Sequence, residues 1–294
     1  MKIGIAGTGR MGAAIALRLI EVGHELTVWN RTPEKTKGPA AAGAKVAATP
    51  AALVDGVEVI ITMLTDDKSI AELYHGPQGL LSGNAKGKLF IEMSTVRPEV
   101  SKALAAKVKS AGGAFVECPV GGTVGPAKEG KLFGFVGGEP ADVARARPLL
   151  EQMCRRVEHV GPVGAGASMK LAINLPLIVY WQALGEALSL VNHLGLEPQR
   201  VMDILSDTSG APNMLKNRAG AIAAALGGKD NPPSVTIDTL KKDLSEMVAE
   251  ARACGYETLV TQAALQSFEK ASRAGVGAKD CTALPVSWVT RITS

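Results

Sequence analysis

The first half of the chain alternates short apolar or β-branched runs with amphipathic helical stretches. The runs are Lys2–Ala6, Glu25–Asn30, Val57–Leu64, Lys88–Ser94, Ala114–Val120, Leu132–Val136 and Arg156–Val160. Helical patterns such as Met11–Val22 and Glu99–Ala111 separate the first five runs. Strands that alternate with helices predict a parallel sheet covered on both faces. The sixth run follows the fifth after a glycine-rich loop and no helix, so we expect the last strands to pair differently from the first.

From Gly161-Pro162 onwards the pattern becomes helical, because β-branched clusters are rare and apolar residues recur at the helical period. The helical segments are 167–194, 198–208, 236–254 and 261–274. Glycine and proline interrupt regular structure, so Pro162 marks a boundary. We therefore predict a sheet domain over residues 1–162 and an all-helical domain over residues 163–294. The second domain would begin with a long interdomain helix.

The composition supports two globular domains. The 294 residues are 46% hydrophobic and 20% charged, as in an ordinary folded protein. The net charge of +4 is spread along the chain without a run of five basic residues, so we expect no nucleic-acid partner. The most apolar long stretch, 171–190, contains Asn174, Pro176, Gln182 and Glu186. These groups are costly in lipid, which favours a buried helix of a soluble protein and no membrane partner.

The cysteines and the N-terminus bear on location. Cys118, Cys154, Cys254 and Cys281 include no Cys-x-x-Cys pair, which argues against a zinc site and against a disulfide framework. We therefore predict no metal and a reducing compartment. The chain enters its first apolar run directly, without a separate targeting segment. A cytoplasmic location is the expectation.

A Gly-x-Gly-x-x-Gly motif lies between the first predicted strand and the first predicted helix. It consists of Gly7, Thr8, Gly9, Arg10, Met11 and Gly12. The first glycine permits a tight turn, the second lets a pyrophosphate approach the backbone, and the third lets helix and strand pack closely. The alternative is an ordinary glycine-rich turn. The position inside a strand–helix–strand unit favours a Rossmann-type, doubly wound dinucleotide-binding domain.

The end of the second predicted strand bears on the choice of cofactor. About 20 residues beyond the glycines, NAD enzymes usually carry an acidic residue for the ribose 2′-hydroxyl, and here Asn30, Arg31 and Thr32 stand instead. Asn30 would bond the ribose without repelling a 2′-phosphate, while Arg31 and Thr32 offer donors to its oxygens. NADP is therefore predicted over NAD. The alternative is that Arg31 is a solvated turn residue.

Lys170 and Asn174 are the candidates for chemistry. They stand four residues apart near the start of the long helix after the boundary, so both project from one face. Hydride transfer to or from a carbonyl compound requires a positioned acid/base. Apolar neighbours would partly desolvate Lys170 and favour loss of its proton, which makes it a usable acid/base. On spacing alone, a lysine that reaches solvent from a helix start remains an equal alternative.

Taken jointly and in order, these residues resemble the β-hydroxyacid dehydrogenases, the family of 3-hydroxyisobutyrate dehydrogenase. Within it the chain looks most like the glyoxylate and succinic semialdehyde reductases, over nearly its whole length. The motifs that carry the resemblance are Gly7–Gly12, Trp29–Thr32, Met63-Leu64, Met93–Thr95 with Pro98, Pro119-Val120 through Gly122 to Pro126-Ala127 and Gly130, Gly164–Gly166, Lys170 with Asn174, and Lys242-Asp243.

The resemblance implies that Lys170 is the catalytic acid/base and that Asn174 helps to hold the substrate. The residues it places at the cofactor, or along the wall of the site, are Met63, Leu64, Thr95 and Lys242. Lys242 is expected to serve both cofactor and substrate. The resemblance further implies a helical domain like the C-terminal domain of 6-phosphogluconate dehydrogenase and assembly into a homodimer or homotetramer.

The departures from the family fall where substrate is bound. The family usually has Ser-Gly-Gly after Pro-Val, whereas this chain has Gly121, Gly122 and Thr123. We expect Gly122 and Thr123 to receive the distal group of the substrate through backbone N–H groups and a hydroxyl. An equal alternative is that the glycines allow close approach of the cofactor. Pro176 removes a helix hydrogen bond two residues past Asn174, and a kink there would alter where Lys170 and Asn174 point.

The sequence thus predicts an NADP-dependent oxidoreductase that moves a hydride between cofactor and a small β-hydroxy acid, semialdehyde or 2-oxo acid. An imine reductase is one alternative, which Lys170 argues against because that position is typically Asp or Tyr there. A non-catalytic NADP-binding module is another, which the joint presence of Lys170, Asn174 and Lys242 disfavours. The departures at Gly121 and Pro176 leave the substrate itself open.

Overall fold

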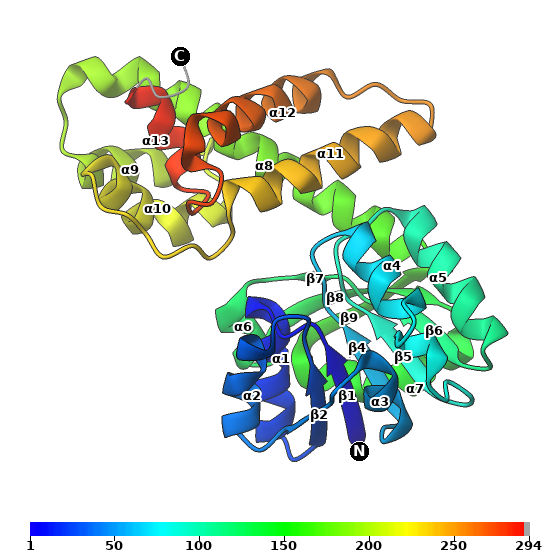
Figure 1. Ribbon diagram of the computed structural model, residues 1–294. Coiled ribbons are helices and arrows are strands. Elements are labelled where there is room, and N and C mark those ends of the chain that lie inside the picture. The colour runs from blue at the N-terminus through cyan, green and yellow to red at the C-terminus, as the bar shows by residue number, and fades with distance from the viewer. Residues whose placement is uncertain (291–294) are drawn as a thin grey trace. The chain divides into compact units, whose positions relative to one another are not determined.

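The computed structural model describes residues 1–290 and divides into two compact units, Met1–Leu171 and Ala172–Ser294 (Figure 1). The first unit is an α/β sandwich and the second is helical. The predicted fold class is therefore confirmed. The predicted domain boundary between residues 162 and 163 stays a prediction.

The first unit is built on a mixed sheet, which among residues 1–290 has nine strands. They are β1 (Lys2–Ala6), β2 (Glu25–Trp29), β3 (Lys45–Val46), β4 (Val59–Thr62), β5 (Leu89–Glu92), β6 (Ala114–Glu117), β7 (Val120–Gly121), β8 (Leu132–Gly138) and β9 (Cys154–Gly161). The strand order is β3-β2-β1-β4-β5-β6-β8-β7, with β9 paired to β8. Strands β1 to β6 are parallel, while β8 is antiparallel to β6 and β7. The order reverses between β1 and β4, which is where open α/β sheets bind ligands at the carboxyl ends of their strands.

Helices cover both faces of this sheet. They are α1 (Arg10–Glu21), α2 (Lys37–Ala41), α3 (Pro50–Asp55), α4 (Asp67–His75), α5 (Pro98–Ser110), α6 (Val124–Lys128) and α7 (Pro140–Met153). Helices α1 and α7 bury residues such as Leu19 and Leu150 on one face. Helices α3, α4 and α5 bury residues such as Leu53, Leu73 and Leu104 on the other. Each fully buried side chain of this kind contributes about 1.5–3 kcal/mol relative to exposure, so the two layers stabilise the sheet.

Over its described residues, 172–290, the second unit contains helices only, apart from one isolated bridge between Thr236 and Asp280. Helix α8 (Ala165–Val191) starts in the first unit and continues into the second. The others are α9 (Pro198–Ser206), α10 (Asn213–Leu226), α11 (Ile237–Ala253), α12 (Leu259–Ala271) and α13 (Ala283–Val289). Thr236 caps α11 by accepting a hydrogen bond from the Thr239 N–H, as expected of a hydroxyl at that position.

Helix α8 with the turn after it, residues 165–194, is long and apolar enough to cross a membrane by length and composition. The core helix of a soluble protein has the same properties. Gln182 on this helix is buried, donates a hydrogen bond to Glu186 at 2.9 Å and accepts one from the Trp288 indole at 3.1 Å. Such satisfied polar groups are typical of a core helix.

Several details differ from the sequence-based predictions. The fifth run is split into β6 and β7 by Pro119, which has no N–H for the ladder. The short helix α6 lies between β7 and β8, so the prediction of no helix there is wrong. Strand β3 and helices α10 and α13 were not predicted, since two residues, an alanine-rich stretch and a seven-residue helix carry little periodic signal. Helix α8 continues through Pro176.

Candidate active site

The glycine loop after β1 has the geometry of a dinucleotide-binding turn. Gly7 has φ +100°, a left-handed conformation that favours glycine. A Cβ on Gly7 would collide with the Met63 carbonyl, and one on Gly12 would collide with the Gly7 carbonyl. A Cβ on Gly9 would meet no atom within 4 Å. Gly7 and Gly12 therefore serve packing between β1, β4 and α1, whereas Gly9 faces open space.

The N-terminus of α1 can accept an anionic group. Its N-cap is Gly9, with no side-chain cap and no acidic residue in the first turn, so its first N–H groups have no partner of their own. The Thr8 hydroxyl is buried and has no hydrogen-bond partner among the described residues. Free N–H groups, a positive helix end and an unpartnered hydroxyl fit the pyrophosphate of a nicotinamide dinucleotide.

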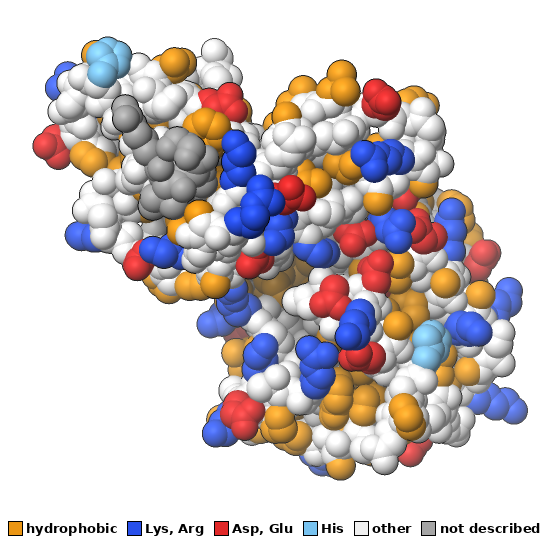
Figure 2. All heavy atoms as spheres, turned by 45° about the horizontal axis from the view of Figure 1, so that its top comes forward, with side chains coloured by type: hydrophobic (Ala, Val, Ile, Leu, Met, Phe, Trp, Pro, Cys, Tyr) orange, Lys and Arg blue, Asp and Glu red, His pale blue; other side chains and the backbone are white. Residues whose placement is uncertain are grey.

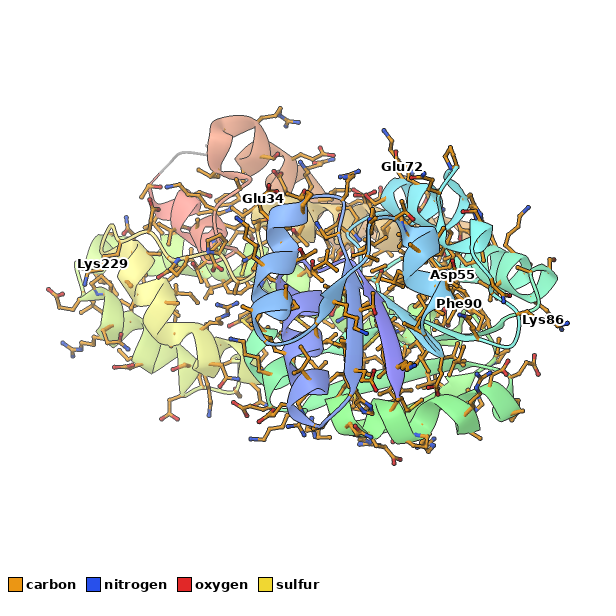
Figure 3. The ribbon with its side chains drawn as sticks, turned by 60° about the horizontal axis from the view of Figure 1, so that its bottom comes forward. Glu34, Asp55, Glu72, Lys86, Phe90 and Lys229 are labelled. Carbon is orange, nitrogen blue, oxygen red and sulfur yellow. The ribbon has the colours of Figure 1, made fainter. Side chains whose placement is uncertain are left out.

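Asn30 connects this loop to the turn after β2. Its Oδ1 accepts a hydrogen bond from the Thr8 N–H at 3.0 Å, and its Nδ2 donates to the Thr32 carbonyl at 3.0 Å. Both ends of the Asn30 amide therefore bond to backbone groups, one in the glycine loop and one in the turn after β2. Sequence spacing alone did not indicate this structural role. The neighbouring Arg31 is exposed and forms an ion pair with Glu72 on α4 at 3.3 Å. Figure 3 shows the labelled Glu72 at the outer side of its helix.

A buried hydrogen-bond network locks the carboxyl ends of β4 and β5. The Thr62 hydroxyl donates to Glu92 Oε2 at 2.6 Å and lies 3.0 Å from the Tyr74 hydroxyl. Glu92 Oε1 accepts from the Ser94 N–H at 2.8 Å, and Ser94 Oγ accepts from the Leu64 N–H at 2.8 Å. Burial raises the pKa of the Glu92 carboxyl, against the lowering effect of the Ser94 and Thr62 hydrogen bonds.

This network fixes the loops that carry two of the residues assigned to the cofactor. Leu64 belongs to it directly, and the half-buried Thr95 follows Ser94. Met63 is held at the close approach to Gly7. Sequence reasoning missed Glu92, because a single glutamate at a strand end carries no motif. Its place at the end of an otherwise apolar strand was the available signal.

The loop after β6 leads to the predicted substrate residues. Val120 and Gly121 form β7, paired to Gly134 and Phe133 of β8. Gly122 has φ +124°, and a Cβ there would lie 2.8 Å from the Leu132 side chain. Thr123 is exposed and stands at the N-cap of α6 without a side-chain capping bond. The Thr123 hydroxyl is thus not committed to capping, while the Thr123 carbonyl accepts a hydrogen bond from the Ala127 N–H at 3.0 Å.

The structure places Lys170 and Asn174 one turn apart on α8, with both side chains buried at 8% and 9% exposure. A buried lysine is rare unless it is paired or functional. Lys242 lies on α11, with its Nζ 2.8 Å from the Asp243 carboxylate. The glycine loop and Lys170 belong to the first unit, as do Gly122 and Thr123. Asn174 and Lys242 belong to the second unit.

Two family models match the chain. Residues 2–161 match the NAD binding domain of 6-phosphogluconate dehydrogenase. Residues 164–286 match the NAD-binding domain of NADP-dependent 3-hydroxyisobutyrate dehydrogenase. The chain belongs to the β-hydroxyacid dehydrogenase family.

Individual relatives agree with the family models. Glyoxylate/succinic semialdehyde reductase 1 of Arabidopsis thaliana is 31% identical over 97% of this chain and 97% of its own. The 3-hydroxyisobutyrate dehydrogenase of Pseudomonas aeruginosa is 32% identical over 87% of each. The solved structure of Psf3 in complex with NADP+ and 2-OPP superimposes with a TM-score of 0.85 at 27% identity over 99% of each chain. An imine reductase from Myxococcus stipitatus, at 18% identity and a TM-score of 0.66, shares the fold alone.

Family membership and the geometry of the glycine loop agree on the class of protein. The chain is an NAD(P)-dependent oxidoreductase that acts on a small molecule, and it binds a nicotinamide dinucleotide. On the face shown in Figure 2, lysine and arginine side chains are interspersed with acidic ones. A surface of mixed sign is what solvated charges produce.

Proposed function

We propose that the protein is an NADPH-dependent reductase of a small semialdehyde or 2-oxo acid, which in the reverse direction oxidises the corresponding β-hydroxy acid. The observation that carries the proposal is the burial of Lys170 one turn inside α8, in the same unit as the dinucleotide-binding loop. A lysine at this position can serve as a general acid because its ammonium group carries a proton that can be transferred to a substrate oxygen.

In this proposal a nicotinamide dinucleotide held by the glycine loop would supply the hydride for the carbonyl carbon. Lys170 donates its proton to the carbonyl oxygen, and in the reverse direction its amine accepts the hydroxyl proton. Asn174, one turn further along α8, orients the substrate oxygen or carboxylate. Thr95 and Lys242 would hold the nicotinamide end, and Gly122 with Thr123 would bind the distal group of the substrate through N–H groups and a hydroxyl.

The preference for NADP over NAD rests on the turn after β2. Arg31 and Thr32 are exposed there, and no carboxylate stands at positions 30 to 32 to repel a 2′-phosphate. The family model for residues 164–286 is described as NADP-dependent, and Psf3 was solved with NADP+. A cytoplasmic location and assembly into a homodimer or homotetramer stay predictions of the family resemblance and of the cysteine pattern.

The experiment that tests this function follows NADPH absorbance with a panel of carbonyl compounds. The panel contains glyoxylate, succinic semialdehyde, methylmalonate semialdehyde, tartronate semialdehyde and a cyclic imine, each with NADPH and with NADH. The proposal requires turnover of at least one acid, with a higher kcat/KM for NADPH. Turnover of the imine alone would support the imine reductase alternative, and binding without turnover of any compound would support the non-catalytic module.

A further inference from the structure

Glu117, the last residue of β6, accepts hydrogen bonds from the start of helix α8. Its Oε1 lies 2.7 Å from the Gly164 nitrogen, 2.8 Å from the Gly166 nitrogen and 3.2 Å from the Ala167 nitrogen. The glutamate is buried at 1% exposure. A single oxygen thus serves three backbone donors that are about 50 residues away along the chain.

Helix α8 depends on this oxygen because its own sequence contains no N-cap. Residues 161–167 are Gly-Pro-Val-Gly-Ala-Gly-Ala, without the Ser, Thr, Asp or Asn that normally caps a helix. The first N–H groups of a helix have no partner within it, and each one buried without a partner costs about 1–3 kcal/mol. Gly164, at φ +101°, turns the chain so that its N–H points at the same oxygen.

The surrounding residues leave room for the carboxyl group. A Cβ on Gly137 of β8 would collide with Glu117 Oε1. A Cβ on Gly166 would collide with the Phe135 carbonyl oxygen and would lie 3.2 Å from Glu117 Oε1. Glycine at 137 therefore leaves the space that the carboxyl group occupies, and glycine at 166 lets the first turn of α8 lie close to the backbone of β8.

Glu117 also begins the segment that leads to the substrate loop. Lys170 lies three residues after Ala167, about 4.5 Å further along the helix axis at 1.5 Å per residue. On the other side of the contact, Gly122 and Thr123 follow Glu117 by five and six residues. One carboxyl group thus joins the element that carries the proposed proton donor to the segment that carries the proposed substrate loop.

We propose that Glu117 is a positioning residue that fixes the first turn of α8, and with it Lys170, against the carboxyl end of β6. This inference rests on the proposed function of Lys170. The positioning depends on an oxygen acceptor at Oε1 rather than on a full charge. Glutamine presents the same oxygen on a side chain of the same length, while alanine removes it and aspartate withdraws it by one methylene.

The pKa of Glu117 agrees with a cap that does not need the charge. Burial raises the pKa of this carboxyl, while the Ser101 hydroxyl and the three backbone N–H groups lower it. Both the carboxylate and the neutral acid keep an oxygen that can accept the three N–H groups.

The test compares Glu117→Ala, Glu117→Asp and Glu117→Gln in the full chain, with kcat, KM for the carbonyl substrate and the dissociation constant of NADPH as readouts. Displacement of a catalytic group by about 1 Å costs on the order of 100-fold in rate. We expect Glu117→Ala and Glu117→Asp, which would displace Lys170 by up to about this distance, to lower kcat by about 10–100-fold, with NADPH binding unchanged. Glu117→Gln should keep most of the wild-type kcat.

Two further variants separate positioning from loss of stability. Val108→Ala removes buried volume from α5, and at a matched loss of Tm it should retain kcat. Gly166→Ala keeps the carboxyl group but displaces the first turn of α8, so it should lower kcat while NADPH still binds. If Glu117→Ala does not fold, Glu117→Asp and Gly166→Ala decide the question.

Three results would overturn the inference. The first is a wild-type kcat in Glu117→Ala, and the second is an equal loss of kcat in Glu117→Ala and Glu117→Gln. The third is a loss of kcat in Val108→Ala as large as that in Glu117→Ala. Lys170→Ala distinguishes this failure from failure of the proposed function. An inactive Lys170→Ala beside a fully active Glu117→Ala rejects the positioning alone. A fully active Lys170→Ala rejects the proposed function itself.

Discussion

The guanidinium of Arg31 lies 3.3 Å from the carboxylate of Glu72, and their side chains are 74% and 51% exposed. Exposed ion pairs of this kind are weak and exchange partners readily. Arg31 is also the residue that we expect to bind the 2′-phosphate of NADP. A bound phosphate must therefore compete with Glu72 for the same guanidinium.

This competition predicts opposite effects for the two residues. Arg31→Ala should raise KM for NADPH by about 10-fold or more, since a hydrogen bond to a charged group is worth about 1.5–3 kcal/mol, and should leave KM for NADH nearly unchanged. Glu72→Gln should lower KM for NADPH by about 2–5-fold, as removal of a weak exposed pair allows. Steady-state kinetics with both cofactors measures this.

A suitable control is Glu151→Gln, which removes a carboxylate that pairs with Arg147 on α7. This substitution should change neither KM for NADPH nor KM for NADH. An equal effect of Arg31→Ala on KM for NADPH and KM for NADH would contradict the assignment of Arg31 to the 2′-phosphate.

Gly121 offers a test of the substrate loop. A Cβ there would lie 3.7 Å from the Phe135 ring, an ordinary contact, and the backbone has no positive φ. The serine that the family usually carries at this place can therefore be introduced without strain. Gly121→Ser should raise kcat/KM for carboxylate substrates by about 10-fold, because a hydroxyl bond to a charged group contributes about 1.5 kcal/mol or more.

Gly121→Ala supplies the steric control, and an uncharged aldehyde supplies the chemical one. Gly121→Ala should not show the increase in kcat/KM for carboxylate substrates, and Gly121→Ser should not show it with the uncharged aldehyde. If Gly121→Ser and Gly121→Ala behave alike towards acids, the loop does not bind a carboxylate in the way proposed.

Glu92 makes a prediction about stability and pH. Burial raises the pKa of its carboxyl in the folded protein above the ordinary value of 4.5. A raised folded pKa means that folding favours the protonated form, so its contribution to stability is full below pH 4.5 and is lost as pH rises through the folded pKa. Glu92→Gln has no such proton to lose. The free energy of unfolding of Glu92→Gln should therefore increase relative to that of the wild type as pH rises from 4.5 through the folded-state pKa of Glu92.

Urea unfolding at a series of pH values measures that difference. Glu257→Gln, which removes an exposed carboxyl group outside this network, is the control and should give the same pH dependence of unfolding as the wild type. A constant offset between Glu92→Gln and the wild type would show that Glu92 does not titrate in this range.

Local patterns predicted much of the first unit. The glycine motif, the strands of the parallel half of the sheet and the caps follow from short-range chemistry, and the structure confirms β1 at its predicted bounds. Asp66 caps α4 by accepting a hydrogen bond from the Ser69 N–H at 2.7 Å, which lies three residues away in the sequence. Such features are determined by neighbouring residues, so a single sequence contains them.

Long-range contacts could not be predicted in the same way. Glu117 meets its three N–H donors only because β6 ends beside the start of α8, and Glu92 meets Thr62 and Tyr74 only because β4 and β5 are adjacent. Neither glutamate has a motif around it. Helices α10 and α13 lack a clear apolar period, and their positions depend on tertiary packing.

The most direct test of the account is the rate of NADPH oxidation by Lys170→Ala with whichever acid the wild type reduces. General acid catalysis contributes about 100–10,000-fold, so kcat should fall by at least about 100-fold while the dissociation constant of NADPH stays at the wild-type value. Lys107→Ala, which removes an exposed lysine from α5, should leave both unchanged. Wild-type turnover in Lys170→Ala would contradict the account.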